Sequence, residues 1–276
     1  MRKCLAGSLL PPDTLAHGNA VTQQPSIRTE NITIRFGGHA AVSNVTCAFH
    51  PGELTVIVGP NGAGKTTWFN IVSGQLRPSE GRVVLGERDV TALSPSDRAR
   101  AGIGRAFQLT TLFPKLSVFE NVRLAVQAHA GQGHRLFTRA GSLTGLADRT
   151  MHYLEQTNLA SVATLPAAAL PHGDQRKLEV AMLLAMEPQI FMFDEPTAGM
   201  SVDEAPVILD LIARIKQDTS RTILLVEHKM DVVRTLADRI VVLHNGELVA
   251  DGEPGEVMAL ELVREIYLGV GADEVA

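Results

Sequence analysis

The segment Gly59-Pro60-Asn61-Gly62-Ala63-Gly64-Lys65-Thr66 matches the pattern G-x-x-x-x-G-K-[ST] at every fixed position. It follows the continuous apolar run 54–58, which is typical of a strand buried on both faces. We expect a helix over 66–73, closed by Gly74, to present its positive end to an anion bound by the loop. The order of strand, glycine loop and helix favours a phosphate-binding loop over a plain glycine turn.

The residue types in this loop fit a nucleotide. Glycines let the backbone fold so that successive N–H groups point at phosphates. We expect Lys65 to reach the β- and γ-phosphates and the Thr66 hydroxyl to ligate Mg²⁺. The residues predicted to contact nucleotide here are Gly59, Pro60, Asn61, Gly62, Ala63, Gly64, Lys65, Thr66 and Thr67.

A second apolar run, 190–193, ends in two acids. Asp194 is expected to hold Mg²⁺, and Glu195 to polarise an attacking water as a general base. Many strands end in an acid at a turn, so this pair is informative only because it follows a complete phosphate loop. Together with the phosphate loop, the pair indicates a nucleotide site that uses Mg²⁺.

Strands and helices alternate after the loop, which predicts an α/β fold with a mainly parallel sheet. We expect residues 223–226 to form another buried strand. The segment 240–250 is typical of a hairpin that turns at Asn245-Gly246. Short strands at 32–36, 41–49 and 81–90 contribute an antiparallel β edge, and a helical lobe is inserted at about 110–187. The expected inner face of the helix after Glu195 is made of Ile208, Leu211, Ile212 and Ile215.

Composition excludes several classes. The 276 residues carry 25 Lys+Arg against 30 Asp+Glu, a net charge of −5, which argues against nucleic acid as the main partner. Two cysteines cannot form a disulfide framework, and no His/Cys cluster has zinc spacing. Residues 1–27 form an extension that we expect to be disordered. No apolar run reaches the roughly 20 residues that cross a bilayer, so we expect the chain not to enter a membrane.

Over 28–270 the sequence resembles the ATPase subunits of ATP-binding cassette (ABC) transporters. The resemblance implies that Phe36 stacks on adenine and that Gln108 joins the metal site to the helical lobe. It also implies that Gln108 is both a metal ligand and a catalytic residue. It also implies that His228, which follows Val226-Glu227, contacts the γ-phosphate. ATP and Mg²⁺ are the expected cofactors.

The signature loop departs from the family pattern Leu-Ser-Gly-Gly-Gln. Here it is Leu170-Pro171-His172-Gly173-Asp174, and in the family this loop of one subunit caps the ATP of the other. Pro171 has neither the serine hydroxyl nor a backbone N–H, and Asp174 adds negative charge. Gly173 and the helix start remain, so we expect Pro171 and Gly173 to form a working but slower cap. Ser201, where the family commonly has Asp or Asn, is a second difference.

Several stretches are most similar to the ATPases of branched-chain amino acid importers. They are Phe36-Gly37-Gly38, Arg105-Ala106-Phe107-Gln108, Leu112-Phe113-Pro114, Glu120-Asn121-Val122, the run 172–179, the run 195–200 and Tyr267-Leu268-Gly269. Urea and short-chain amide importers share this branch, so the solute stays open.

The resemblance implies a cycle in which two ATPase subunits, identical or different, bind ATP and close against a membrane permease at the cytoplasmic side of a bacterial inner membrane. A periplasmic binding protein would deliver the solute. Residues 110–115 are our candidate for the permease contact, or else an ordinary exposed loop. Two alternatives remain: an ABC ATPase that moves no solute, and a weakly hydrolysing regulatory partner subunit.

Overall fold

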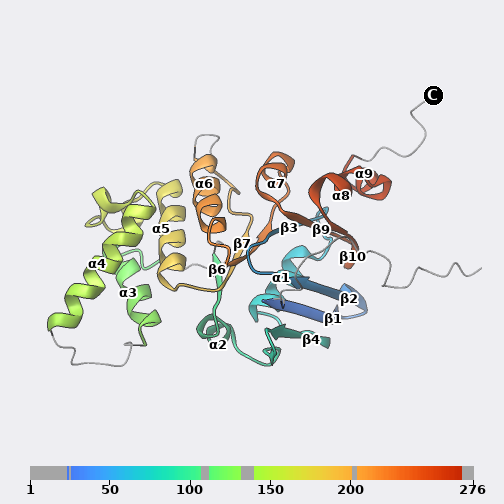
Figure 1. Cartoon of the computed structure of the whole chain (residues 1–276), viewed down its shortest axis with the longest axis horizontal. Helices are drawn as coiled ribbons and strands as arrows, with labels where there is room; N and C mark the ends of the chain where they lie inside the picture. Colours follow the sequence, from blue (N-terminus) through green and yellow to red (C-terminus); the bar gives the residue numbers. More distant parts are fainter. Residues whose placement is uncertain (1–23, 25, 107–111, 132–139, 201–203, 269–276) are drawn as a thin grey trace, which may run out of the picture.

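The computed structural model describes residues 24, 26–106, 112–131, 140–200 and 204–268 (Figure 1). Its centre is a six-stranded sheet in the order β10-β9-β3-β8-β7-β6. The first five strands along the chain in this sheet, all parallel, are β3 (Leu54–Val58), β6 (Ile103–Ala106), β7 (Ile190–Asp194), β8 (Thr222–Val226) and β9 (Arg239–His244). β10 (Glu247–Gly252) runs antiparallel to β9 through the turn predicted at Asn245-Gly246.

A separate antiparallel sheet has the order β2-β1-β4-β5. Its strands are β1 (Ile27–Phe36), β2 (His39–Phe49), β4 (Glu80–Leu85) and β5 (Arg88–Asp89). Helix α1 (Lys65–Ser73) lies between the two sheets, where Trp68 and Phe69 are fully buried. The predicted antiparallel edge is therefore a second layer, joined to the parallel sheet through the helix that begins at the phosphate loop.

The opposite face of the parallel sheet is covered by helices from the second half of the chain. Val56 and Val58 of β3 pack there with Ile208 and Ile212 of α6, whereas Ile57 belongs to the core around α1. The helices on this side are α6 (Ala205–Lys216), α7 (Met230–Leu236), α8 (Pro254–Ala259) and α9 (Glu261–Leu268). Both faces of β3 are thus covered, as its continuous apolar run predicts.

The helical lobe occupies one end of the molecule, at the left in Figure 1. It consists of α3 (Val118–His129), α4 (Ala140–Gln156), α5 (His172–Ala185) and two short 3₁₀ turns, Ala160–Val162 and Ala167–Ala169. Its own core includes Val122, Leu154 and Leu178. Helix α2 (Pro95–Arg100) precedes β6. Among the described residues, no helix combines the length and the hydropathy that a membrane span requires.

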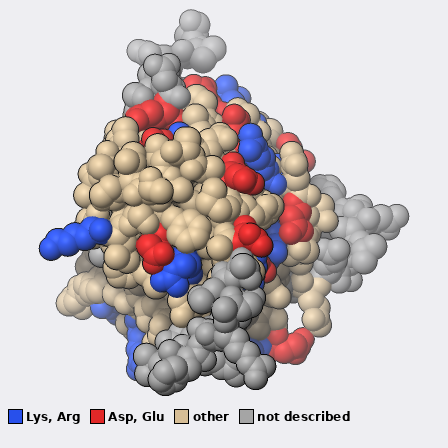
Figure 2. Space-filling model, turned by 90° about the vertical axis from the view of Figure 1, so that its left-hand side faces the viewer, with Lys and Arg blue, Asp and Glu red and all other residues tan. Residues whose placement is uncertain are grey.

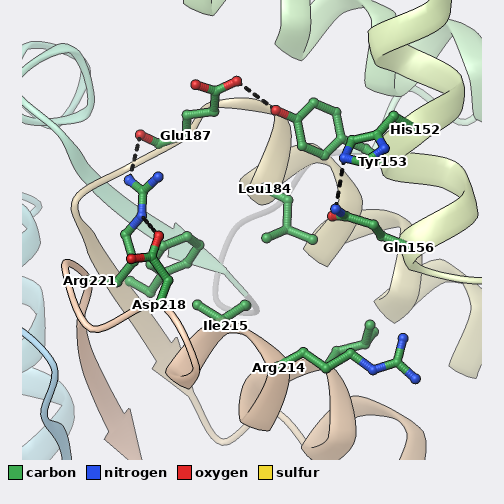
Figure 3. Close-up of a pocket in the computed structure, with 11 residues that line it drawn as sticks. His152, Tyr153, Gln156, Leu184, Glu187, Arg214, Ile215, Asp218 and Arg221 are labelled. Atoms are coloured by element: carbon green, nitrogen blue, oxygen red, sulfur yellow. Dashed lines mark hydrogen bonds and ion pairs between the residues drawn. The ribbon is translucent and has the colours of Figure 1, made fainter.

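One turn ties the lobe to the parallel sheet. Glu187, between α5 and β7, accepts hydrogen bonds from the Tyr153 hydroxyl (2.7 Å) and from Arg149 (2.6 Å), both on α4. Arg221, just before β8, donates to the carbonyl oxygens of Glu187 (3.4 Å) and Pro188 (2.6 Å). Figure 3 shows Tyr153, Glu187 and Arg221 around a cavity of about 400 Å³ between α4, α5 and α6. These hydrogen bonds join the helical lobe to the segment that leads into β7, the strand that ends at Asp194.

Candidate functional site

The loop between β3 and α1 is held in shape by its neighbours. Gly64, the residue before α1, has a φ of 96°, and a Cβ there would lie 2.5 Å from the carbonyl oxygen of Ala41 in β2. Only glycine fits this position without displacing β2. The N–H of Gly246 donates to the Ala63 carbonyl at 3.1 Å, which fastens the loop to the β9–β10 turn. The loop is therefore fixed from two sides before any ligand binds.

A cavity of about 210 Å³ lies against this loop and the first turn of α1. The first N–H groups of a helix lack partners within the helix, and they attract anions together with the helix dipole. No acidic residue lies in the first turn of α1 to compete. The cavity is lined by His39, Ala41, Asn61, Gly62, Ala63, Gly64, Lys65, Thr66, Thr67 and Glu195. Its size suits a phosphate chain, with the rest of a nucleotide lying outside.

The ammonium group of Lys65 is turned back onto the loop. Nζ donates to the carbonyl oxygens of Gly59 (2.7 Å) and Pro60 (3.0 Å). Burial lowers the pKa of Lys65, while the nearby carboxylates of Glu195 and Asp194 raise it. A phosphate in the cavity would offer this cation charged acceptors, which make stronger hydrogen bonds than the two carbonyls do.

Asp194 ends β7 and is 8% exposed. Its Oδ2 accepts a hydrogen bond from Arg105 at 2.7 Å, within an ion pair whose two side chains are both nearly buried. Burial raises the pKa of Asp194, and the Arg105 guanidinium opposes that shift. The other oxygen, Oδ1, has no hydrogen-bond partner within the described part of the chain.

Arg105 itself is a site residue that the sequence analysis named only as part of a family stretch. One of its terminal nitrogens donates to Asn70 Oδ1 and Ser73 Oγ, both at 2.7 Å, and the guanidinium lies 4.8 Å from the centre of the Phe69 ring. It therefore connects β6, β7 and α1. The available signal was a charged residue inside the short stretch 103–106, three positions before Gln108.

The described residues fit a magnesium ion that arrives with a nucleotide. They contain no group of three or more His, Cys, Asp or Glu side chains that could hold a metal by themselves. Mg²⁺ is commonly bound through one or two protein oxygens together with phosphates and water. Thr66 lines the cavity, and Asp194 has an oxygen without a partner among the described residues, so these two residues could supply such oxygens.

Glu195, which lines the cavity, lies close to His228. Glu195 has a φ of 48°, uncommon for a residue with a side chain, and its N–H donates to the Val226 carbonyl at 3.0 Å. Its carboxylate Oε1 lies 3.9 Å from His228 Nδ1, and the two side chains are 41% and 55% exposed. Backbone strain of this kind is common at functional sites. Both side chains are free to meet a ligand or water.

Two further predicted contacts have different outcomes. Phe36 ends β1, is 52% exposed, and pairs across the hairpin with His39, which lines the cavity. An exposed aromatic ring thus lies next to the phosphate cavity. Gln108 and Ser201 lie outside the described residues, as does most of the predicted 1–27 extension.

The signature loop is not part of this cavity. Pro171 is the N-cap residue of α5 and is exposed, while Gly173 is buried at a position where a Cβ would lie 2.5 Å from Glu204 Oε1. The Asp174 carboxylate pairs with Lys177 at 2.7 Å. The added negative charge that the sequence suggested is therefore compensated one helical turn away. Pro171 and Gly173 do not line the phosphate cavity of their own chain.

Comparison with known proteins gives a consistent result. The model of the ABC transporter family matches residues 42–198. The high-affinity branched-chain amino acid transport ATP-binding protein LivG of Escherichia coli is 36% identical over 253 residues, which cover 89% of this chain and 98% of that protein. The corresponding protein BraF of Pseudomonas aeruginosa is 34% identical over 251 residues, with the same coverage of both chains.

Solved structures agree with these matches. A nucleotide-free ATP-binding cassette from an ABC transporter superposes with a TM-score of 0.75 at 28% identity, covering 90% of this chain and 99% of that one. A dimeric cassette in a post-hydrolysis state bound to ADP and Pi gives a TM-score of 0.70 at 26% identity, covering 83% and 98%. The chain belongs to the ABC transporter family, as an ATP-binding subunit that hydrolyses ATP to drive transport.

Proposed function

We propose that this subunit hydrolyses Mg²⁺-ATP to power the import of branched-chain amino acids or related amides through a separate permease. The observation that carries the proposal is the phosphate cavity, where Lys65 and Glu195 face one small space beside a helix N-terminus. The class of solute is supported by relatives that are named for branched-chain amino acid transport. This chain aligns with 98% of the length of these relatives.

In this proposal the phosphates of ATP lie against residues 59–67, and Phe36 stacks on the adenine. Thr66 and Asp194 hold Mg²⁺, with Gln108 as a further ligand. The ion, when bound, neutralises charge on the phosphates during transfer. Lys65 leaves the Gly59 and Pro60 carbonyls for the β- and γ-phosphates. Arg105 keeps one oxygen of Asp194 occupied, so that the other remains available to the metal.

Glu195 is the general base in the proposed reaction. Its exposed carboxylate accepts a proton from the water that attacks the γ-phosphate, and His228 contacts that phosphate from the other loop. Gln108 links this chemistry to the helical lobe. The exposure of the Glu195 carboxylate and its place in the lining of the phosphate cavity support this role.

A second ATPase subunit, identical or closely related, completes each site. Pro171 and Gly173 lie outside the phosphate cavity of their own chain, and they are proposed to cap the ATP of the partner. The helix that starts at His172 can supply backbone N–H groups to that phosphate even without the serine hydroxyl. Similarity to a dimeric cassette supports this arrangement.

The permease is proposed to dock in an apolar groove of about 430 Å³ between the lobe and the edge strand β6. Phe113, 46% exposed, lies in the groove and within our predicted contact 110–115. The other residues that line it are Ala99, Ile103, Gly104, Arg105, Leu124, Ala125, Ala128, Glu179, Met182, Leu183, Met186 and Pro188. Arg105 connects this groove to Asp194, so a docked permease segment would touch the metal site through one side chain.

The outer surface of the lobe supports contact with another protein. Figure 2, which views the molecule from the lobe end, shows a broad area without charged side chains, with Lys, Arg, Asp and Glu gathered around it. In the proposed assembly this subunit lies at the cytoplasmic side of a bacterial inner membrane, and a periplasmic binding protein delivers the solute on the other side.

The test is to purify the full chain from solubilised membranes and to identify the permease that accompanies it. Ala128→Glu places a charge in the groove at an exposed position of α3 and should abolish co-purification. Ala130→Glu, exposed just beyond the same helix and outside the groove, is the matched control and should leave it intact. A chain found without any membrane partner would contradict the transport proposal.

A further inference from the structure

Two loops at the nucleotide edge meet at one buried carboxylate. Glu227, the residue after β8, is 1% exposed, and the Thr197 hydroxyl donates to its Oε1 at 2.7 Å. The backbone N–H groups of His228 and Lys229 donate to its Oε2 at 2.8 and 3.1 Å. Since Thr197 lies two residues after Glu195, Glu227 joins the loop of one proposed catalytic residue to the loop of the other.

The His228 ring has carboxylates on one side. Nδ1 lies 3.8 Å from Glu227 Oε2 and 3.9 Å from Glu195 Oε1. Both distances are longer than a direct hydrogen bond, so neither carboxylate fixes the orientation of the ring by itself. The ring is 55% exposed, which leaves its backbone as the main source of its orientation.

We propose that Glu227 is a positioning residue for ATP hydrolysis, which sets the separation and orientation of Glu195 and His228 by tying their loops together. The inference rests on the proposed function, in which those two side chains act on ATP. Glu227 touches neither nucleotide nor water in this role. It acts through His228, whose backbone N–H donates to it, and through Thr197, whose hydroxyl donates to it.

The chemistry of Glu227 supports positioning over simple packing. A buried ionised carboxylate is costly unless it is fully hydrogen-bonded, and an apolar side chain would fill the same space without that cost. At the opposite end of the same strand, Thr222 is also fully buried and hydrogen-bonded, to Ser26 Oγ and the His50 carbonyl. At that end of β8, the neighbouring segments are connected through the neutral hydroxyl of Thr222. At the other end, where Glu195 and His228 lie, the connection is made by the carboxylate of Glu227.

The experiment measures kcat, KM for ATP and equilibrium ATP binding in the assembled transporter. Glu227→Ala should lower kcat about 10- to 100-fold, the range expected for lost hydrogen bonds to a charged group, with KM and ATP binding within about twofold. Glu227→Gln keeps the shape and an acceptor oxygen and should recover most of the rate. Thr197→Val, which removes one hydrogen bond, should lower kcat about two- to tenfold.

Thr222→Val is the matched control, since it removes an equally buried hydroxyl from the far end of β8. It should lower the Tm as much as Thr197→Val does while leaving kcat unchanged. If both threonine variants lower kcat equally, or if Glu227→Gln is as slow as Glu227→Ala, Glu227 is only a structural residue and the proposal fails.

A double-mutant cycle tests whether Glu227 acts through His228. In a His228→Ala background, Glu227→Ala should cause a smaller further loss than it does in the unmodified protein, because one of the two side chains that it positions is already gone. Losses that multiply would overturn the proposal. If Glu227→Ala does not fold, Thr197→Val takes its place in the cycle. Full activity of His228→Ala would instead overturn the proposed role of His228, which separates failure of the function from failure of this inference.

Discussion

The phosphate loop and the start of α5 are both helix N-termini, yet they are built differently. Around the loop, Gly64 packs against β2, Lys65 is bonded to two carbonyls, and Asp194 is held by Arg105. At the start of α5, Pro171 caps the helix without a side-chain hydrogen bond and stands exposed. One terminus is preorganised by its own chain, whereas the other presents little beyond backbone.

This difference indicates where each terminus obtains its partner. A preorganised anion site can bind nucleotide in a single subunit, because its cation and the first turn of its helix already line one cavity. An exposed terminus whose acidic side chain, Asp174, is already paired with Lys177 gains energy only when another molecule brings the phosphate to it. We therefore expect changes at the first terminus to alter binding and chemistry strongly, and changes at the second to alter the rate moderately.

The largest effect is expected for Glu195→Gln. Removing the general base should lower kcat about 10²- to 10⁴-fold, while ATP binding persists because no phosphate contact is lost. Steady-state hydrolysis and equilibrium ATP binding measure the two quantities. Glu247→Gln, an exposed acid on β10, is the control and should be silent. A Glu195→Gln variant that hydrolyses ATP at the normal rate would refute the assignment of Glu195 as the general base.

Lys65→Ala should come next. It deletes the only cation that lines the phosphate cavity among the described residues, so ATP should bind about 10- to 100-fold more weakly, the range of one or two charge-assisted hydrogen bonds. Calorimetric titration of the purified chain with ATP measures the change. Lys115→Ala, exposed in the lobe, provides the comparison and should bind normally. Equal affinities of the two variants would refute the assignment of the cavity.

Pro171→Ser tests the weaker terminus. A serine restores a hydroxyl and an N–H at the N-cap, and one added hydrogen bond to a charged phosphate should raise the ATPase rate about tenfold. The rate is measured on the assembled transporter. An unchanged rate would show that the signature loop does not limit hydrolysis.

The smallest effect is expected for Asp174→Asn. Because Lys177 already pairs with this carboxylate at 2.7 Å, removing the charge should change the ATPase rate by less than about twofold. Lys177→Ala leaves the carboxylate uncompensated and should slow hydrolysis more than Asp174→Asn does. The opposite order would indicate that Asp174 itself repels the nucleotide.

Much of the fold was predictable because its strands are continuous apolar runs. The runs at β3, β7 and β8 were each confirmed to within one residue, as was the turn at Asn245-Gly246. The edge strand β6 was not expected, because Gly104 and Arg105 interrupt its apolar character. Helices α2, α7, α8 and α9 are short, from six to eight residues, and give too little periodicity to recognise.

The candidate site was predictable where local pattern determines it. The phosphate loop lies between a strand and a helix, as its motif requires, and Asp194 and Glu195 lie at a strand end beside it. Arg105 and Glu227 were missed because their partners are distant in sequence: Arg105 pairs with a residue 89 positions away, and Glu227 with one 30 positions away. The pairing of Asp174 with Lys177 was a local signal that the sequence analysis overlooked.

The most direct test of the central claim is ATP hydrolysis by the transporter reconstituted in proteoliposomes with the proposed periplasmic binding protein. We predict that leucine-loaded binding protein raises the ATPase rate several-fold over the unloaded protein, and that Glu195→Gln abolishes both the basal and the stimulated rate. An ATPase rate that the loaded binding protein does not raise, or that is unchanged in Glu195→Gln, would contradict the account.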